Sequence, residues 1–217
     1  FLFGMFQLED ALKALSGRSF KLFLRKQTKN RIKAVLSGTA ITAILQSSSV
    51  VSLMVLAFVG AGIIEMKHAL GVIFGSNLGT TFTGWIVATI GFKLDIESFS
   101  LPAIGIGTIL MMAFSEKKKI FNISRFVVGF GFLFMGLDFM KVSIEHFAEN
   151  MDISLFAGYS AIVFLFLGLV LTAVIQSSSA TLVIVLSALN SGVIDIYQSA
   201  AMVIGANVGT SITVILG

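Results

Sequence analysis

Residues 42–52 read TAILQSSSVVS, and residues 172–182 read TAVIQSSSATL. A shift of 130 residues therefore places one Gln-Ser-Ser-Ser segment, 46–49, on another, 176–179. The same shift aligns 77–80 (NLGT) with 207–210 (NVGT), and sixteen of the forty-eight pairs from 38 to 85 are identical without a gap. Many of these identities fall on Gln, Ser, Asn, Gly and Thr, whereas chance matches in apolar sequence fall on Leu, Val and Ile. The chain therefore contains an internal repeat.

The composition indicates a membrane protein. Of the 217 residues, 56% are hydrophobic and 12% are charged, whereas a soluble domain keeps about 25% charged. Residues 69–92, 153–194 and 196–217 contain no Asp, Glu, Lys or Arg, and each stretch exceeds the ~18 residues that mark a spanning helix. The absence of cysteine excludes disulfides and thiolate metal sites. The net charge of +4 comes from basic connections beside apolar segments, so it does not indicate nucleic-acid binding.

Charge in these connections predicts how the chain meets the bilayer. Residues 18–33 hold seven basic residues and no acidic one, and 117–125 is also basic, whereas 93–97 and 145–152 are net acidic. The positive-inside rule places both basic connections in the cytoplasm. This placement requires 34–58 to enter and return on one side, since a full crossing would put 117–119 outside. About ten residues on either side of 46–49 reach roughly 15 Å, half the bilayer.

We therefore expect an all-α membrane protein of two inverted-topology repeats, each with a re-entrant helical hairpin and an interrupted transmembrane helix. Repeat 1 is expected over 1–115, with a basic interfacial helix at about 18–33 and a hairpin at about 34–58. A cytoplasmic basic linker is expected over 116–124. Repeat 2 is expected over 125–217, with a hairpin at about 157–190. It is expected to be truncated, because nothing follows that matches helix 99–115.

The two Gln-Ser-Ser-Ser segments form the candidate anion site. A hairpin tip inside the membrane leaves helix-end N–H groups that must face a cavity or a ligand. Serine hydroxyls can cap the returning helix, and the free N–H groups with the helix dipole attract an anion. Small polar residues also serve close helix packing, but a duplicated motif at midplane depth favours a site. The candidate substrate ligands are Gln46, Ser47, Ser48, Ser49, Gln176, Ser177, Ser178 and Ser179.

The Asn-x-Gly-Thr segments form the candidate cation site. Glycine tolerates the backbone angles of an unwound turn, whose free carbonyls, with Asn and Thr oxygens, suit a hard cation. The alternative is that each Asn only satisfies a helix break. Neither hairpin nor the apolar segment after it contains Lys, Arg, His or a carboxylate, so Na⁺ is a better partner for an anion than H⁺. The candidates are Asn77, Gly79, Thr80, Thr81, Asn207, Gly209, Thr210 and Ser211, with Ser52, Thr42 and Thr172 as weaker ones.

At these residues the chain resembles the type II sodium–phosphate cotransporter family, including its bacterial members. The resemblance rests on the duplicated Gln-Ser-Ser-Ser, each followed by Gly-x-Asn-x-Gly-Thr at 75–80 and 205–210, and it covers nearly the whole chain. It implies Na⁺-driven uptake of inorganic phosphate by alternating access across the cell (inner or plasma) membrane, with both ions held around the hairpin tips. Ser52 has Leu182 as its counterpart, so we expect the two halves of the site to differ.

Other functions stay open at this point. A Na⁺-coupled carrier of a dicarboxylate or sulfate would suit the same tips, and a phosphate sensor or scaffold would bind without transporting. An enzyme is not expected, because no metal cluster, nucleophile–base pair or phosphate-cradling loop is apparent. We expect no cofactor beyond co-transported Na⁺, no transition metal and no nucleic acid. The expected partners are phosphate, sodium ions and membrane lipids, and a homodimer is left open.

Overall fold

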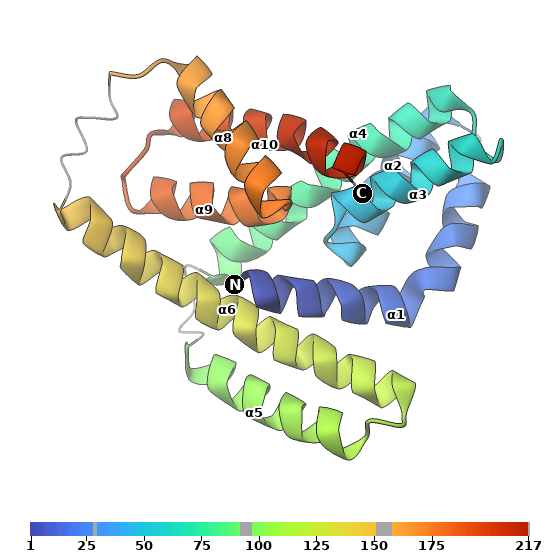
Figure 1. Cartoon of the computed structure of the whole chain (residues 1–217), viewed down its shortest axis with the longest axis horizontal. Helices are drawn as coiled ribbons and strands as arrows, with labels where there is room; N and C mark the ends of the chain where they lie inside the picture. Colours follow the sequence, from blue (N-terminus) through green and yellow to red (C-terminus); the bar gives the residue numbers. More distant parts are fainter. Residues whose placement is uncertain (28–29, 92–96, 151–157, 217) are drawn as a thin grey trace.

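The computed structural model describes residues 1–27, 30–91, 97–150 and 158–216. Nearly all of this part is helical, which confirms the all-α prediction (Figure 1). The α-helices are α1 Leu2–Gln27, α2 Arg31–Leu45, α3 Ser48–Gly60, α4 Met66–Ile86, α5 Glu97–Ala113, α6 Lys118–Asn150, α8 Ala161–Ile175, α9 Ser178–Asn190 and α10 Ile196–Leu216. A π-helical turn, η1 Val87–Gly91, follows α4 directly.

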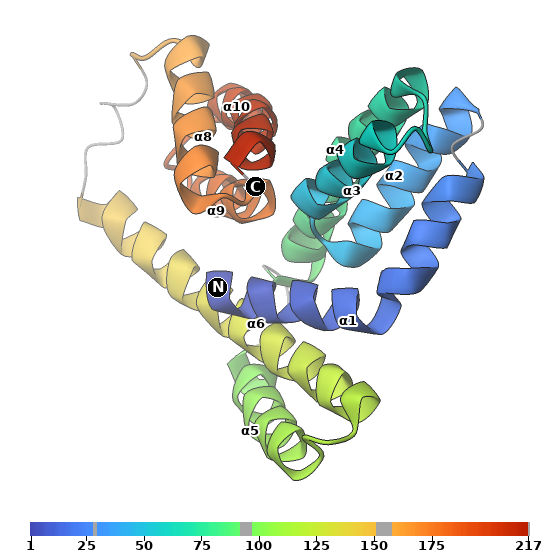
Figure 2. The same ribbon diagram turned by 45° about the vertical axis from the view of Figure 1, so that its right-hand side comes forward.

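The sequence repeat is also a structural repeat. Helices α2, α3 and α4 form one group, and α8, α9 and α10 form a second (Figure 2). In each group the first and third helices pack along each other, and their backbones touch at equivalent places. A Cβ atom on Gly38 would meet the carbonyl oxygen of Val72, and one on Gly168 would meet that of Met202, 130 residues further on in both cases.

Helices α1 and α6 cross beneath the two groups, and α5 packs against α6 (Figures 1 and 2). Small residues bring α1 and α6 together, because a Cβ atom on Gly4 would lie 2.7 Å from the carbonyl oxygen of Gly129, and one on Gly129 would lie 2.7 Å from the Leu8 nitrogen. Glycines of this kind let helices approach closely in membranes. The contact fixes which face of α1 meets the two repeats.

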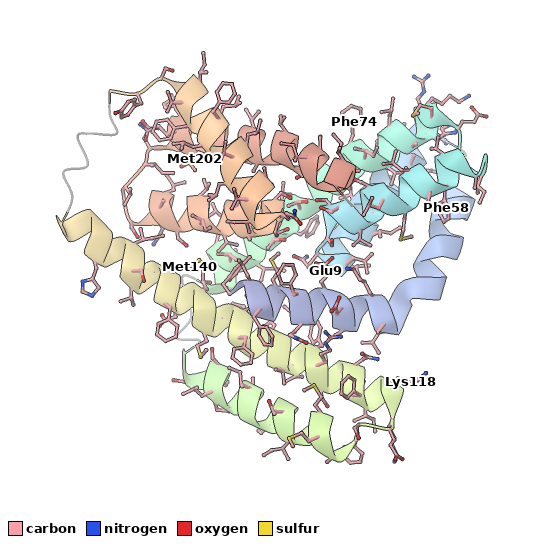
Figure 3. All side chains as sticks on the ribbon, in the orientation of Figure 1. Glu9, Phe58, Phe74, Lys118, Met140 and Met202 are labelled. Atoms are coloured by element: carbon pink, nitrogen blue, oxygen red, sulfur yellow. The ribbon has the colours of Figure 1, made fainter. Side chains whose placement is uncertain are left out.

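Large apolar side chains cover the outside of the molecule. Phe74 and Trp85 of α4 are each 68% exposed, Met112 of α5 is 74% exposed and Ile215 of α10 is 81% exposed; Figure 3 labels Phe74 at the edge of the structure. In the described part of the chain, two helical stretches, Met66–Thr89 and Lys118–Ile144, are long and apolar enough to cross a bilayer. Such a surface suits a lipid environment.

The predicted interruption of the transmembrane helices is wrong. Helix α4 continues through 77–81 and α10 continues through 207–211. The glycines serve helix packing instead: a Cβ atom on Gly75 would collide with the carbonyl oxygen of Val35 on α2, and one on Gly205 would collide with that of Leu165 on α8. The same residue type that permits unwinding also permits this close approach.

Other boundaries differ from the expected ones. Helix α1 continues through Gln27, where a separate interfacial helix was expected over 18–33. Helix α6 begins at Lys118, so most of the expected linker 116–124 is its first two turns. The second hairpin was expected to begin at about 157, a residue outside the described ones, and α8 begins at Ala161.

Candidate functional site

Each Gln-Ser-Ser-Ser segment breaks its helix in the same way. Gln46 (φ 56°, ψ 23°) follows α2, and Gln176 (φ 57°, ψ 29°) follows α8. Both lie in the left-handed region, which is uncommon for a residue other than glycine. Their backbone N–H groups donate to the carbonyl oxygens of Thr42 and Thr172, each at 2.7 Å. This left-handed cap ends the helix and redirects the chain, so that the next helix begins two residues later.

Serine then starts the returning helix. Ser47 and Ser177 have extended backbones, and their hydroxyls accept from the N–H of Val50 at 3.5 Å and of Ala180 at 3.2 Å. Serine is a preferred N-cap because its oxygen satisfies a free N–H of the first turn. Each repeat therefore contains a helix–break–helix hairpin, with the N-terminus of a thirteen-residue helix at its tip.

The two hairpin tips meet. The hydroxyl oxygens of Ser48 and Ser178 lie 3.4 Å apart, and these residues are equivalent in the repeat. Contact between equivalent residues is the mark of a two-fold axis. Two packing contacts between the helix groups are reciprocal as well, because α9 packs on α4 and α10 packs on α3. The structure thus brings the two tips to one place through equivalent contacts of the two repeats.

The tips line one cavity of about 100 Å³, which we call the tip cavity. A water molecule needs only roughly 10–15 Å³ of such space, so the cavity accommodates a small ion with water. All eight predicted anion ligands line it, together with Met5, Phe6, Glu9 and Val50. The two sequence segments therefore form one candidate site.

The tip cavity is rich in hydrogen-bonding groups. Ser47, Ser48, Ser177, Ser178 and Ser179 are each no more than 9% exposed. The N-termini of α3 and α9 carry the positive ends of two helix dipoles, and serine capping pairs one N–H group in each first turn. Buried groups of this kind are stable only when they are paired. An anion with several acceptor oxygens pairs them and also meets the dipoles.

A second cavity holds part of the predicted cation site. Asn77, Thr80 and Thr81 of α4 and Asn207 of α10 line a space of about 320 Å³, which also reaches Ser178. Its other lining residues are mostly apolar. Ser178 lines this space and the tip cavity, so the two adjoin at α9.

The other predicted cation residues do not gather there. A Cβ atom on Gly79 would lie 2.6 Å from the Thr39 carbonyl oxygen, and one on Gly209 would lie 2.8 Å from that of Leu169, so both glycines pack against a neighbouring helix. Thr210 is buried and donates to the carbonyl oxygen of Ala206 at 3.1 Å. Ser211 is exposed.

The three weaker candidates show how the halves differ. Thr172 donates to the Thr181 hydroxyl at 2.9 Å, and Thr181 donates to the Ser177 carbonyl oxygen. In the first repeat Val51 stands in place of Thr181, and the buried Thr42 hydroxyl has no hydrogen-bond partner. Ser52, which follows Val51 on α3, is 6% exposed. The predicted asymmetry is therefore present, and it extends beyond Ser52.

Sequence reasoning missed Thr83, the partner of the first glutamine. The Thr83 hydroxyl donates to Gln46 Oε1 at 2.5 Å, and Gln46 Nε2 donates to the Ala43 carbonyl oxygen at 2.5 Å. This pair ties the first tip to α4. Thr83 is identical to Thr213 at the 130-residue shift, and this identity is the sequence signal that could have pointed to Thr83.

Sequence reasoning also missed a carboxylate. Glu9 of α1 lines the tip cavity, and among the described residues that line it, Glu9 alone carries a charge. Its side chain is 12% exposed, and its Oε1 lies 2.7 Å from Lys13 Nζ. Figure 3 shows Glu9 on the side of α1 that faces the α2–α3 hairpin. An acidic residue in an apolar membrane segment is the signal that points to it.

Comparison with known families identifies the family of the chain. Residues 1–142 and 154–217 match the family described as Na⁺/Pi-cotransporter. The chain belongs to this family. The resemblance carried by the duplicated Gln-Ser-Ser-Ser is thereby confirmed, and the apolar helices are those of a membrane protein.

Relatives of this Na⁺/Pi-cotransporter family member differ in length. The chain is 31% identical to "Uncharacterized protein YqeW" of Bacillus subtilis (strain 168), across the whole chain and 69% of that protein. It is 21% identical to "Putative inorganic phosphate export protein YjbB" of Escherichia coli (strain K12), across 99% of the chain and 39% of that protein. A stretch of 59 residues is 36% identical to "Sodium-dependent phosphate transport protein 2A" of Oryctolagus cuniculus, covering 27% of the chain and 9% of that protein. No solved structure matches the chain.

Proposed function

We propose that this chain forms the membrane core of a secondary transporter that couples Na⁺ influx to the movement of inorganic phosphate. The observation that carries the proposal is the meeting of two Gln-Ser-Ser-Ser breaks in one cavity. The cavity offers serine hydroxyls and two helix N-termini, which suit an ion with several acceptor oxygens. Membership of the Na⁺/Pi-cotransporter family favours phosphate over other anions of similar shape.

Helix length supports a re-entrant placement of both hairpins. Helices α2 and α8 have 15 residues, and α3 and α9 have 13. At 1.5 Å per residue they reach about 20 Å, whereas the hydrocarbon core is about 30 Å thick. A hairpin that enters and returns on one side places its tip near the midplane. Two such hairpins from opposite faces would make the repeats inverted, in a multi-pass protein of the cell membrane.

Sodium coupling rests on the charge of the site. Among the described residues, no Lys or Arg lines the tip cavity or the adjoining space between α4, α9 and α10. A phosphate ion entering either space would need a counter-charge, because unpaired charge is costly there. The oxygens of Asn77, Thr80 and Asn207 are of the kind that Na⁺ accepts. The printed names of the relatives include both a sodium-dependent phosphate transport protein and a phosphate export protein.

Uptake into proteoliposomes tests the proposal. Radioactive phosphate uptake by the reconstituted protein is expected to require an inward Na⁺ gradient, and it should be inhibited by phosphate more strongly than by succinate or sulfate. Stronger inhibition by succinate than by phosphate would instead indicate a dicarboxylate carrier. Binding without any counterflow would instead indicate a sensor or scaffold.

Glutamine substitutions then test the site. Gln46→Ala and Gln176→Ala each remove hydrogen-bonding groups from the tip cavity, and each is expected to reduce uptake by about tenfold, the effect of losing roughly one or two strong hydrogen bonds. Asn190→Ala is the matched control, because this exposed amide ends α9 away from its tip. Uptake that is unchanged in both glutamine variants would remove the assignment of the site.

A further inference from the structure

We propose that Glu9 is a sodium ligand of the tip cavity, and that sodium bound there raises the affinity of the cavity for the anion. This inference rests on the proposed function and adds a residue of α1 to a site otherwise built by the two hairpins. The cavity's other described lining residues are neutral, and its polar ones are serines and glutamines. Glu9 is therefore the one charged group among the described residues that line the cavity.

Packing directs Glu9 into the site. The close contact of α1 with α6 at Gly4 and Gly129 fixes the rotation of α1 about its axis. Met5, Phe6 and Glu9, which share one face of the helix, consequently line the tip cavity. A carboxylate that is 12% exposed beside serine hydroxyls supplies, with them, the hard oxygen ligands that an alkali or alkaline-earth cation requires.

Glu9 forms an ion pair that uses one of its two carboxylate oxygens. Glu9 pairs with Lys13 through Oε1, and a carboxylate accepts on both of its oxygens. Lys13 also lies 4.0 Å from Asp10, which pairs with Arg125 of α6 at 2.8 Å. Lys13, unlike Glu9, is not among the residues that line the tip cavity. Sodium binding at Glu9 would therefore compete with, or weaken, the pair to Lys13.

Coupling between the two ions follows from this arrangement. A phosphate ion approaching Glu9 meets a like charge, which disfavours entry into a cavity of low dielectric constant. Sodium on the carboxylate removes that repulsion and leaves the serine hydroxyls and helix N-termini available to phosphate. Phosphate affinity then depends on sodium, and by linkage sodium affinity depends on phosphate. This reciprocal dependence is what a coupled transporter needs.

Opposite effects of two substitutions test the inference. Glu9→Gln should raise the Na⁺ concentration for half-maximal phosphate uptake by about tenfold, the effect of removing one partly screened charge pair. Lys13→Met should lower this concentration, because it frees the carboxylate. If Glu9 only held α1 through its ion pair, both variants would break the same pair and shift the Na⁺ dependence in the same direction, or not at all. Either of those results would overturn the inference.

Controls separate this test from folding and from the proposed function. Glu65→Gln is the matched control, because this exposed carboxylate also pairs with a lysine, Lys67, but does not line the cavity, and its Na⁺ dependence should equal that of the wild type. Glu9→Asp keeps the charge, so its Na⁺ concentration for half-maximal uptake should lie above that of the wild type by less than tenfold. This variant keeps the test open if Glu9→Gln does not fold. Thermal unfolding in detergent, measured at increasing Na⁺ concentrations without phosphate, should rank the variants in the same order of Na⁺ affinity. Absence of Na⁺-dependent uptake in the wild type would instead overturn the proposed function, and this inference with it.

Discussion

Gln46 and Gln176 have the same backbone conformation but different side-chain surroundings. Gln46 is tied to Thr83 of α4 and to Ala43 of its own helix, whereas the side chain of Gln176 is exposed. A non-glycine residue in the left-handed region costs energy and persists where the surrounding structure holds it, often at functional sites. The two tips therefore share a geometry while they offer different groups to a ligand. We infer that their roles in transport differ.

The hydroxyls of Thr42 and Thr172 lead to a stability prediction at the residue scale. Thr181→Val would leave the buried Thr172 hydroxyl without its partner, as in the first repeat, and should lower the free energy of unfolding by about 1–3 kcal/mol. Val51→Thr should give Thr42 a partner and leave stability unchanged or higher by about 1 kcal/mol. Thermal unfolding in detergent measures both. Equal loss of stability in the two variants would contradict the asymmetry.

At the scale of elements, glycines decide how the helices of each repeat meet. Gly75 of α4 lies against the carbonyl oxygen of Val35 on α2, and Gly205 of α10 lies against that of Leu165 on α8. Added side chains at these positions would push apart the helices that carry the tips. Helix packing and the geometry of the tip cavity are therefore linked through a few close backbone contacts.

Gly75→Ala is predicted to be destabilising. The new Cβ atom would collide with backbone that cannot rotate away, and overpacking of this kind costs about 1–3 kcal/mol. Gly105→Ala is the matched control, because Gly105 lies in helix α5 with open space around it, and there alanine should add up to about 1 kcal/mol through helix propensity. Thermal unfolding midpoints of the two purified variants should therefore move in opposite directions.

The hairpin breaks could be predicted from the sequence, but the helical course of α4 could not. A Gln-Ser-Ser-Ser between apolar helical runs contains the cap residues that a break needs. Residues 46–49 and 176–179 were therefore sufficient to predict both helix breaks. Gly75 and Gly79 were ambiguous, because glycine serves unwinding and close packing alike. Only the backbone of α2 across the interface decides between them. Glu9 was missed for a related reason: its exposure to the cavity depends on the packing of α1 against α6.

At the scale of the whole molecule, the two repeats form one candidate site. Residues 48 and 178 are 130 positions apart, and their hydroxyl oxygens lie 3.4 Å from each other. Helices α1 and α6 lie below the two groups (Figure 2). The space between α4, α9 and α10 adjoins the tip cavity. In an alternating-access transporter, one repeat moves against the other around such a site. Fixing the two tips to each other should therefore stop transport.

The most direct test uses the absence of native cysteine. Ser48→Cys with Ser178→Cys should form a disulfide on mild oxidation, because the two side chains already touch. Ser48→Cys with Asn190→Cys, at the far end of α9, is the control pair and should not. Phosphate uptake is measured in proteoliposomes before oxidation, after it and after reduction. We predict that uptake by the first pair falls to background on oxidation and returns on reduction. A cross-linked protein that transports at the rate of its reduced form, or a first pair that links no better than the control, would contradict the account.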